Sequence, residues 1–162
     1  MCVETNVSMT QVLVPKSVLD KIREHENNWP RLSERGGLLL GYRKNDAIQI
    51  DSATFPGRWD YATPTLFRRS EQGHKLRALR EWVRSGQTID WVGEWHTHPG
   101  GVAEPSFVDR RSWRRIAGHT KRLMAFLIFN DTQMYAGLQS PHVSRVKKLT
   151  LDEENDVAKL FT

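Results

Sequence analysis

The chain has little cysteine: Cys2 is the one thiol among its 162 residues. A single cysteine excludes an internal disulfide and any zinc site built from several cysteines of the same chain. The longest apolar run, residues 123–129, is far shorter than the ~18 residues that a membrane-spanning helix needs. Residues 1–10 have neither a basic start nor an apolar stretch, so we expect no signal peptide. These absences predict a protein of the reducing cytoplasm that does not contact membranes.

The excess of positive charge is also small, since 24 Lys and Arg stand against 19 Asp and Glu, which gives a net charge of +5. Two basic clusters stand out, at residues 75–84 and 110–122. Each is typical of the solvent-exposed face of an amphipathic helix. The alternative is a docking patch for a protein tail or for nucleic acid. Without interleaved aromatic residues or a nucleic-acid motif, nucleic acid is the less favoured partner.

The length fits a single domain over residues 1–162, because domains commonly run to about 100–200 residues and no linker or repeat divides the chain. Hydrophobic periodicity and turn residues predict the elements. The expected strands are 9–13, 36–42, 47–54, 89–98, 123–130, 133–139 and 143–151. The expected helices are 15–27, 71–86, 106–118 and a short one at the C-terminus, which the acidic residues 152–156 begin; 55–64 and 99–105 are loops. This order predicts an α/β (α+β) fold, a single mixed β-sheet flanked by helices.

His96 and His98 stand at the end of the strand predicted over 89–98. Side chains two residues apart in a strand point to the same face, so both imidazoles can reach one metal ion. Zinc binds neutral imidazole nitrogens at about 2.0–2.1 Å. Two histidines are too few to define a site, so a third ligand has to come from elsewhere in the chain.

Asp109 is the candidate third ligand. Locally, Ser106 and Asp109 read as a capping box at the start of the helix predicted over 106–118. A carboxylate in the first helical turn can also face back toward the preceding strand. Two histidines and a carboxylate leave a fourth tetrahedral position for water, as in a catalytic zinc site, and such a water has its pKa lowered to about 7.

Two glutamates compete for the general acid/base that this water requires. Glu34 directly precedes the glycine-leucine strand predicted over 36–42, although a polar residue is also ordinary at a strand start. Glu94 shares strand parity with both histidines, so it can point at the same metal ion. The residues alone leave both assignments open.

The spacing of His96, His98 and Asp109 matches the H-x-H-x10-D signature of the JAMM (JAB, MPN+) metallopeptidases. Ser106 falls at the serine of that family's S-x-x-D motif. Glu34 and the glycine-leucine strand after it resemble the family's upstream glutamate and strand.

The resemblance covers about residues 9–140 and implies a JAB/MPN-type fold, which is similar to that of cytidine deaminases. It implies that Glu34 is the general acid/base and that Ser106 helps to hold the oxyanion. The implied Zn²⁺ ligands are His96, His98 and Asp109. Eukaryotic members commonly have an aromatic residue at the position of Glu94.

Residues 93–99 and 104–106 further resemble the small bacterial JAB proteins encoded beside E1- and E2-like enzymes in CBASS anti-phage operons. There the JAB protein removes a cyclic-oligonucleotide synthase (CD-NTase) from its conjugates. The resemblance therefore implies hydrolysis of the isopeptide or peptide bond after the C-terminus of a ubiquitin-like protein or of a conjugated CD-NTase.

Two other functions remain open. A non-catalytic MPN scaffold would bind partners alone, but such scaffolds lose the metal ligands that this sequence keeps. A RadC-like nucleic-acid-associated protein shares a similar H-x-H-P…P-S-x-x-D segment, and the arginines over 110–122 would suit it. The segment around Glu34 favours the peptidase.

Overall fold

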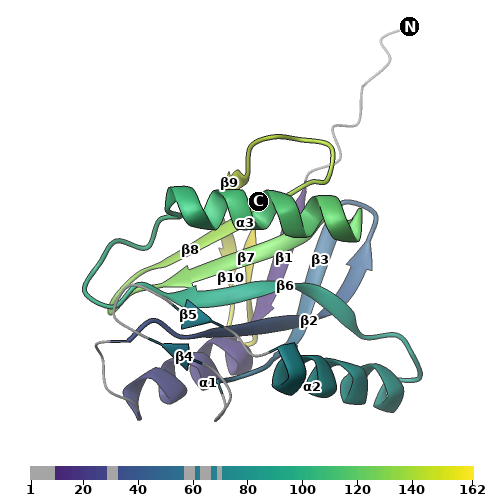
Figure 1. Ribbon diagram of the computed structural model, residues 1–162, viewed down its shortest axis with the longest axis horizontal. Coiled ribbons are helices and arrows are strands. Elements are labelled where there is room, and N and C mark those ends of the chain that lie inside the picture. Colours follow the sequence, from purple (N-terminus) through teal and green to yellow (C-terminus); the bar gives the residue numbers. More distant parts are fainter. Residues whose placement is uncertain (1–9, 29–32, 57–60, 63–66, 69–70) are drawn as a thin grey trace, which may run out of the picture.

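The computed structural model describes residues 10–28, 33–56, 61–62, 67–68 and 71–162. Its helices are α1 (Lys16–Asn27), α2 (Glu71–Arg84) and α3 (Phe107–Thr120). Its strands are β1 (Gln11–Pro15), β2 (Gly36–Lys44), β3 (Ala47–Ala53), β4 (Tyr61–Ala62), β5 (Phe67–Arg68), β6 (Asp90–Thr97), β7 (Met124–Phe129), β8 (Met134–Gln139), β9 (Lys147–Leu149), β10 (Leu151–Glu154) and β11 (Ala158–Phe161). One mixed sheet has the order β10-β11-β1-β3-β2-β6-β7-β8-β9, and β4 pairs with β5 (Figure 1). The predicted α+β class with one large mixed sheet is confirmed.

Strand β7 lies at the centre of the core, and all six of its residues are buried. Alternate side chains of a strand point to opposite faces. Leu127 and Phe129 therefore join the core on the α1 side, whereas Met124, Phe126 and Ile128 join the core on the α3 side. A strand buried on both faces reads as a continuous apolar run, which is why this one was evident in the sequence.

The helices cover both faces of the sheet. Helix α1 contacts β1, β3 and β11, and it buries Val18, Leu19 and Ile22, as their helical spacing predicted. On the opposite face, α2 contacts β2 and β6 and α3 contacts β7 and β8 (Figure 1). Among the described residues, no helix combines the length and the apolar character of a membrane span.

The antiparallel pairing of β2 with β6 places the start of β2 beside the end of β6. Gly36 lies opposite His96. The pairing continues one residue further, because Arg35 N donates to Thr97 Oγ1 at 3.0 Å and Thr97 N donates to Arg35 O at 2.8 Å. The chain before β2 therefore runs alongside His98.

Close packing excludes a side chain at Gly37. A Cβ atom there would lie 2.0 Å from Thr54 O and 2.8 Å from Trp95 Nε1. Thr54 is itself held in place, since Leu38 N donates to its Oγ1 at 2.8 Å and Trp95 Nε1 donates to its carbonyl at 2.9 Å. The close backbone approach predicted for the glycine-leucine strand is confirmed.

The C-terminal segment is a β-hairpin, so the predicted C-terminal helix is wrong. β11 pairs with both β10 and β1, and Phe161 is buried against the core. Asn155 makes the turn, because its side-chain oxygen accepts from Val157 N at 2.8 Å and Ala158 N at 2.9 Å. The acidic residues 152–156 belong to the exposed edge strand β10 and this turn. The pairing of β11 with β1, which would otherwise present an open edge, favours a hairpin over the predicted helix.

The strand predicted over 143–151 begins later and divides at Thr150. Thr150 alone separates β9 from β10, yet these strands stand at opposite ends of the strand order. β9 pairs with β8 and β10 pairs with β11, so the sheet curls until its two ends meet at Thr150. Thr150 and Thr162 exchange two backbone hydrogen bonds of 2.9 Å.

The region between β3 and α2 also differs from the prediction. The loop expected over 55–64 includes β4, which pairs with β5. Helix α2 is present, but its Leu76, Leu79 and Val83 are each more than half exposed. The helix instead turns His74 toward the sheet, where its Nδ1 lies 2.5 Å from Thr54 Oγ1. The predicted chain break at Trp29-Pro30 lies outside the described residues.

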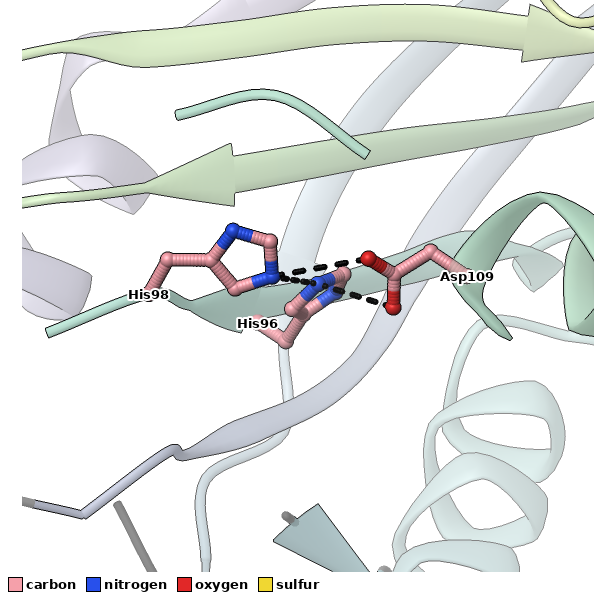
Figure 2. Close-up of side chains that lie close together, drawn as sticks. All are labelled: His96, His98 and Asp109. Carbon is pink, nitrogen blue, oxygen red and sulfur yellow. Dashed lines mark hydrogen bonds and ion pairs between the residues drawn. The ribbon is translucent and has the colours of Figure 1, made fainter. Parts of the chain in front are cut away.

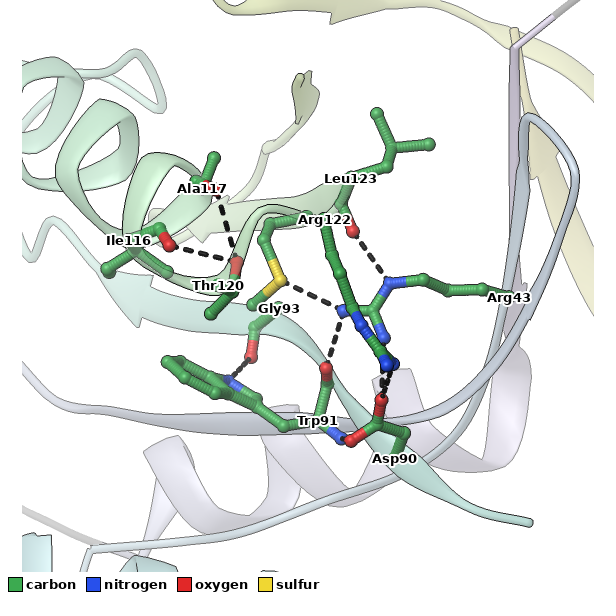
Figure 3. Close-up of polar contacts among 10 residues, drawn as sticks. Arg43, Asp90, Trp91, Gly93, Ile116, Ala117, Thr120, Arg122 and Leu123 are labelled. Carbon is green, nitrogen blue, oxygen red and sulfur yellow. Dashed lines mark hydrogen bonds and ion pairs between the residues drawn. The ribbon is translucent and has the colours of Figure 1, made fainter. Parts of the chain in front are cut away.

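Arg43 holds the end of the sheet opposite to the histidines. Its Nε donates to Leu123 O at 2.8 Å, and its Nη1 donates to Asp90 Oδ2 at 2.9 Å. Its Nη2 donates to Trp91 O at 2.6 Å, so one guanidinium ties β2 to β6 and to the chain entering β7 (Figure 3). The more exposed Arg122 donates to the same Asp90 oxygen at 2.6 Å.

We expect Arg43→Met to lower the free energy of unfolding by about 2–4 kcal/mol, because it leaves two carbonyls and a carboxylate without their shared donor. Arg122→Ala is the matched control, since its side chain is 60% exposed and its removal should cost less than about 1 kcal/mol. Urea denaturation of both variants measures the difference. Equal losses would show that Arg43 has no special role.

Candidate metal centre

His96, His98 and Asp109 come together between the end of β6 and the first turn of α3, as Figure 2 shows. The Nε2 atoms of the two histidines are 3.0 Å apart. His96 Nε2 lies 3.3 Å from Asp109 Oδ1, and His98 Nε2 lies 3.5 Å from Asp109 Oδ2. Within the described part of the chain, these three residues form the one group of His, Cys, Asp and Glu side chains that could hold a metal ion.

The spacing of these atoms suits a tetrahedral cation. With bonds of about 2.0–2.1 Å, neighbouring ligands of a tetrahedral zinc ion lie roughly 3.4 Å apart. The three measured separations, 3.0, 3.3 and 3.5 Å, surround that value. A donor set of two imidazoles and one carboxylate also leaves a fourth position for water or substrate.

A backbone carbonyl sets the orientation of His98. Its Nδ1 lies 3.0 Å from Val102 O, and a carbonyl can only accept a hydrogen bond. Nδ1 therefore carries the proton, and the lone pair of the neutral ring is on Nε2, which faces His96 and Asp109. A partner of this kind on the second ring nitrogen is typical of metal-binding histidines.

His98 and Asp109 each shift the pKa of the other. The hydrogen bond that the protonated ring of His98 makes to Asp109 is the main cause that raises the pKa of His98, and burial opposes it. Burial pushes the pKa of Asp109 upward, but hydrogen bonds from His96, His98 and Ser106 outweigh it and hold the pKa well below its usual range. Asp109 is therefore ionised at neutral pH, as a metal ligand must be.

The capping box predicted for Ser106 and Asp109 is confirmed as well. Asp109 N donates to Ser106 Oγ at 3.1 Å, and Ser106 N donates to Asp109 Oδ2 at 2.7 Å. The local and the metal interpretations are thus compatible, because Oδ1 still faces His96. Ser106 Oγ accepts through a lone pair, so its hydroxyl proton is still able to donate.

Contacts from distant parts of the chain hold the loop between the histidines and α3. Asn130 Nδ2 donates to Gly101 O at 3.1 Å, Lys148 forms an ion pair with Glu104, and Ala103 is buried. Sequence reasoning missed these residues. No local pattern indicates them, because their partners lie far away in the sequence.

Glu34 and Glu94 both line the groove that contains the candidate metal-binding cluster of His96, His98 and Asp109. Because Gly36 lies opposite His96, the continued pairing carries Glu34 opposite His98, while Glu94 lies two residues before His96 on the same face. The charge of Glu34 contributes to the raised pKa of His98, whereas that of Glu94 is not among the causes. Of the two glutamates, Glu34 is therefore the one whose charge acts on His98.

The groove continues from the cluster along β6, with α3 as one wall. A register shift in the β2–β6 pairing turns Trp91 to the same face as Glu94, although their odd separation would place them on opposite faces of a regular strand. Sequence reasoning missed this, because the bulge arises from pairing. The α3 wall is formed by Arg115, Ile116 and His119, among others.

Residues 15–143 match the family model described as prokaryotic homologs of the JAB domain. The chain belongs to this family. The membership predicted from the H-x-H-x10-D spacing is therefore confirmed.

Named relatives agree with this membership. This JAB-family chain is 41% identical over 125 residues to the CD-NTase/cGAS isopeptidase of Pseudomonas aeruginosa, covering 76% of this chain and 79% of that protein. It is 35% identical over 82 residues to the protein of the same name from Vibrio cholerae, covering 51% and 53%. It is 28% identical over 107 residues to the probable metalloprotease y4qB of Sinorhizobium fredii, covering 65% of each. The matches thus span less than two thirds of the latter two relatives.

A solved structure shares the fold. The solution structure of protein DSY2949 from Desulfitobacterium hafniense superposes with a TM-score of 0.63 at 21% identity, covering 87% of this chain and 92% of that one. At this identity the likeness is one of fold alone.

We expect about one zinc ion per chain. We expect His96→Ala or Asp109→Ala to lose most of it, because the two remaining protein ligands are too few to hold the ion. His119→Ala is the matched control, since this histidine lines the same groove outside the cluster. Elemental analysis after dialysis measures the metal, and circular dichroism shows whether the fold persists. Full metal content in both ligand variants would refute the assignment.

Proposed function

We propose that this protein is a zinc-dependent isopeptidase that acts in the cytoplasm in bacterial anti-phage defence. It would hydrolyse the bond after the C-terminus of a ubiquitin-like protein, or of a CD-NTase conjugated in a ubiquitin-like manner. The observation that carries this proposal is the convergence of His96, His98 and Asp109 in a groove that Glu34 and Ser106 also line. The relative of 41% identity, named a CD-NTase/cGAS isopeptidase, supports the substrate class, and we infer E1/E2-like enzymes as partners in the same pathway.

His96, His98 and Asp109 would hold a Zn²⁺ ion, which would polarise the substrate carbonyl and lower the pKa of a water in its open position to about 7. Glu34 accepts a proton from the attacking water as the new C–O bond forms, and it then passes this proton to the nitrogen of the leaving amine, so that the C–N bond breaks and the amine leaves. Ser106 donates a hydrogen bond to the substrate carbonyl oxygen as negative charge develops there. Asp109 and the hydrogen-bonded His98 hold the ligand geometry.

We also propose that residues 1–162 form a single domain. The family model ends at residue 143, but β9, β10 and β11 complete the same sheet, which supports one folding unit. The converging ligands weigh against a non-catalytic scaffold, since a scaffold has no need of three aligned metal-binding side chains.

Replacement of the two glutamates tests the general acid/base. We expect Glu34→Ala to keep its zinc but to lose hydrolysis by about 10²–10⁴-fold, because a proton-transfer group is removed. Glu94→Ala, the matched control in the same groove, should lose ~10–100-fold in metal affinity or activity, as expected when a residue that positions a ligand is removed. Cleavage of a modifier–target fusion and zinc content are measured on the same samples. An active Glu34→Ala beside a zinc-loaded but inactive Glu94→Ala would reverse the assignment.

The residues before the cleaved bond should be small. We expect the modifier tail to bind in extended form through main-chain hydrogen bonds, so bulky side chains next to the metal should slow turnover. Fusions whose tails end in Gly-Gly, Ala-Ala and Leu-Leu are compared by kcat/KM, with the Gly-Gly tail fastest. Equal rates for all three tails would contradict this binding mode.

A further inference from the structure

The outward face of α3 carries a dense group of positive charges. Four exposed arginines fall within six residues: Arg110, Arg111, Arg114 and Arg115. Among the ion pairs between described residues, none includes any of the four. We call these residues the arginine face.

The arginine face opposes helix stability. Arg110 and Arg114, and likewise Arg111 and Arg115, are four residues apart, a spacing at which like charges destabilise a helix by about 0.2–0.5 kcal/mol per pair. Arg110 and Arg111 also lie close to the N-terminus of α3, where the helix dipole disfavours positive charge. The one acidic residue of the first turn, Asp109, belongs to the metal cluster. Stability of the fold therefore does not account for these arginines.

Two of the basic residues of α2 differ from the arginine face, because they have partners within the chain. Arg84 pairs with Glu81 at 3.4 Å, and Arg77 donates to Phe55 O. Lys75 and Arg80 on the same helix are exposed. Helix α2 therefore offers a control surface of similar charge.

The arginine face is fixed relative to the metal cluster, because α3 carries both. Asp109 lies in its first turn, and Arg115 lines the groove that leads to the cluster. Beside them, Phe107 is 74% exposed and Val108 is 70% exposed. Arginine next to exposed apolar side chains is typical of protein–protein interfaces. A phosphate backbone would satisfy the arginines but would leave the apolar surface uncovered.

We propose that the arginine face, together with Phe107 and Val108, is the docking surface for an acidic, partly apolar segment of the substrate protein. The identification of this segment as substrate rests on the proposed function. Docking on α3 places the segment beside the groove, so the charge of the segment adds to the specificity that the tail provides at the metal.

A binding experiment that needs no hydrolysis tests the surface. Fluorescence anisotropy is measured with a labelled peptide of mixed Glu and Leu, with a counterpart in which Gln replaces every Glu, and with a duplex DNA of equal charge. We expect the acidic peptide to bind the protein roughly tenfold or more tightly than its neutral counterpart at low ionic strength. The triple variant Arg110→Glu, Arg111→Glu, Arg114→Glu should lose this preference, and Lys75→Glu, Arg80→Glu on α2 should keep it.

A cleavage experiment connects the surface to the reaction. The acidic or the neutral peptide is attached next to the cleaved bond of one modifier fusion, and the readout is the ratio of the two kcat/KM values for each variant. The ratio cancels any general loss of activity. We expect a ratio of about ten for the parent and the α2 variant, and near one for the triple variant.

The outcomes separate the two proposals. Hydrolysis without preference for the acidic fusion, or equal binding of both peptides, overturns the docking surface and leaves the isopeptidase standing. Preferential binding of the acidic peptide without hydrolysis of any zinc-loaded sample supports an acid-binding surface and overturns the isopeptidase. Tighter binding of duplex DNA than of the acidic peptide, lost in the triple variant, replaces the protein segment by nucleic acid and overturns the docking proposal.

Discussion

The register of β2 against β6 is the constraint on which the candidate site depends. With Gly36 opposite His96, the chain before β2 brings Glu34 opposite His98, on the face where the candidate metal ligands converge. A slip of one residue would turn every side chain of a strand to the other face. Gly37 opposes such a slip, because a carbonyl lies 2.0 Å from the position its Cβ would occupy. Tight packing at a residue without a side chain thus maintains the alignment of Glu34 with His98.

Helix α3 contributes the second half of the site through a residue with two roles. Asp109 caps its own helix and also faces both histidines, so forming the helix start and placing the carboxylate are one event. Asn130, which directly follows β7, and Lys148 of β9 then hold the intervening loop. The positions of His96, His98 and Asp109 therefore depend on the packing around the ends of β6 and β7, and not on the H-x-H segment alone. The same helix also carries the arginine face on its exposed side. One rigid element therefore presents a carboxylate to the histidines and positive charge to the solvent.

Much of the fold could be predicted because each of its central elements has a strong local signal. Strand β7 is a continuous apolar run, and α1 shows its buried residues at helical spacing. The errors fall where local signals are weak. Residues 152–156 are acidic and exposed, which suits a helix start as well as an edge strand. The pairing of β10 with β11, which itself pairs with the open side of β1, decides between them. The exposed Leu76 and Leu79 of α2 show that an apolar helical stripe does not by itself tell which face meets the sheet.

The order of residues along the chain was enough to predict the candidate ligand types and their local spacing: two histidines two residues apart in a strand, and a carboxylate in the first turn of the next helix. It also predicted Glu34 before the glycine-leucine strand, while leaving Glu94 as a rival. The folded arrangement was needed to show that Asp109 reaches both histidines and that the charge of Glu34 acts on His98. Periodicity along the chain encodes which face a side chain takes within its own element. The distance between elements depends on strand register and packing, which residues far apart in the sequence set together.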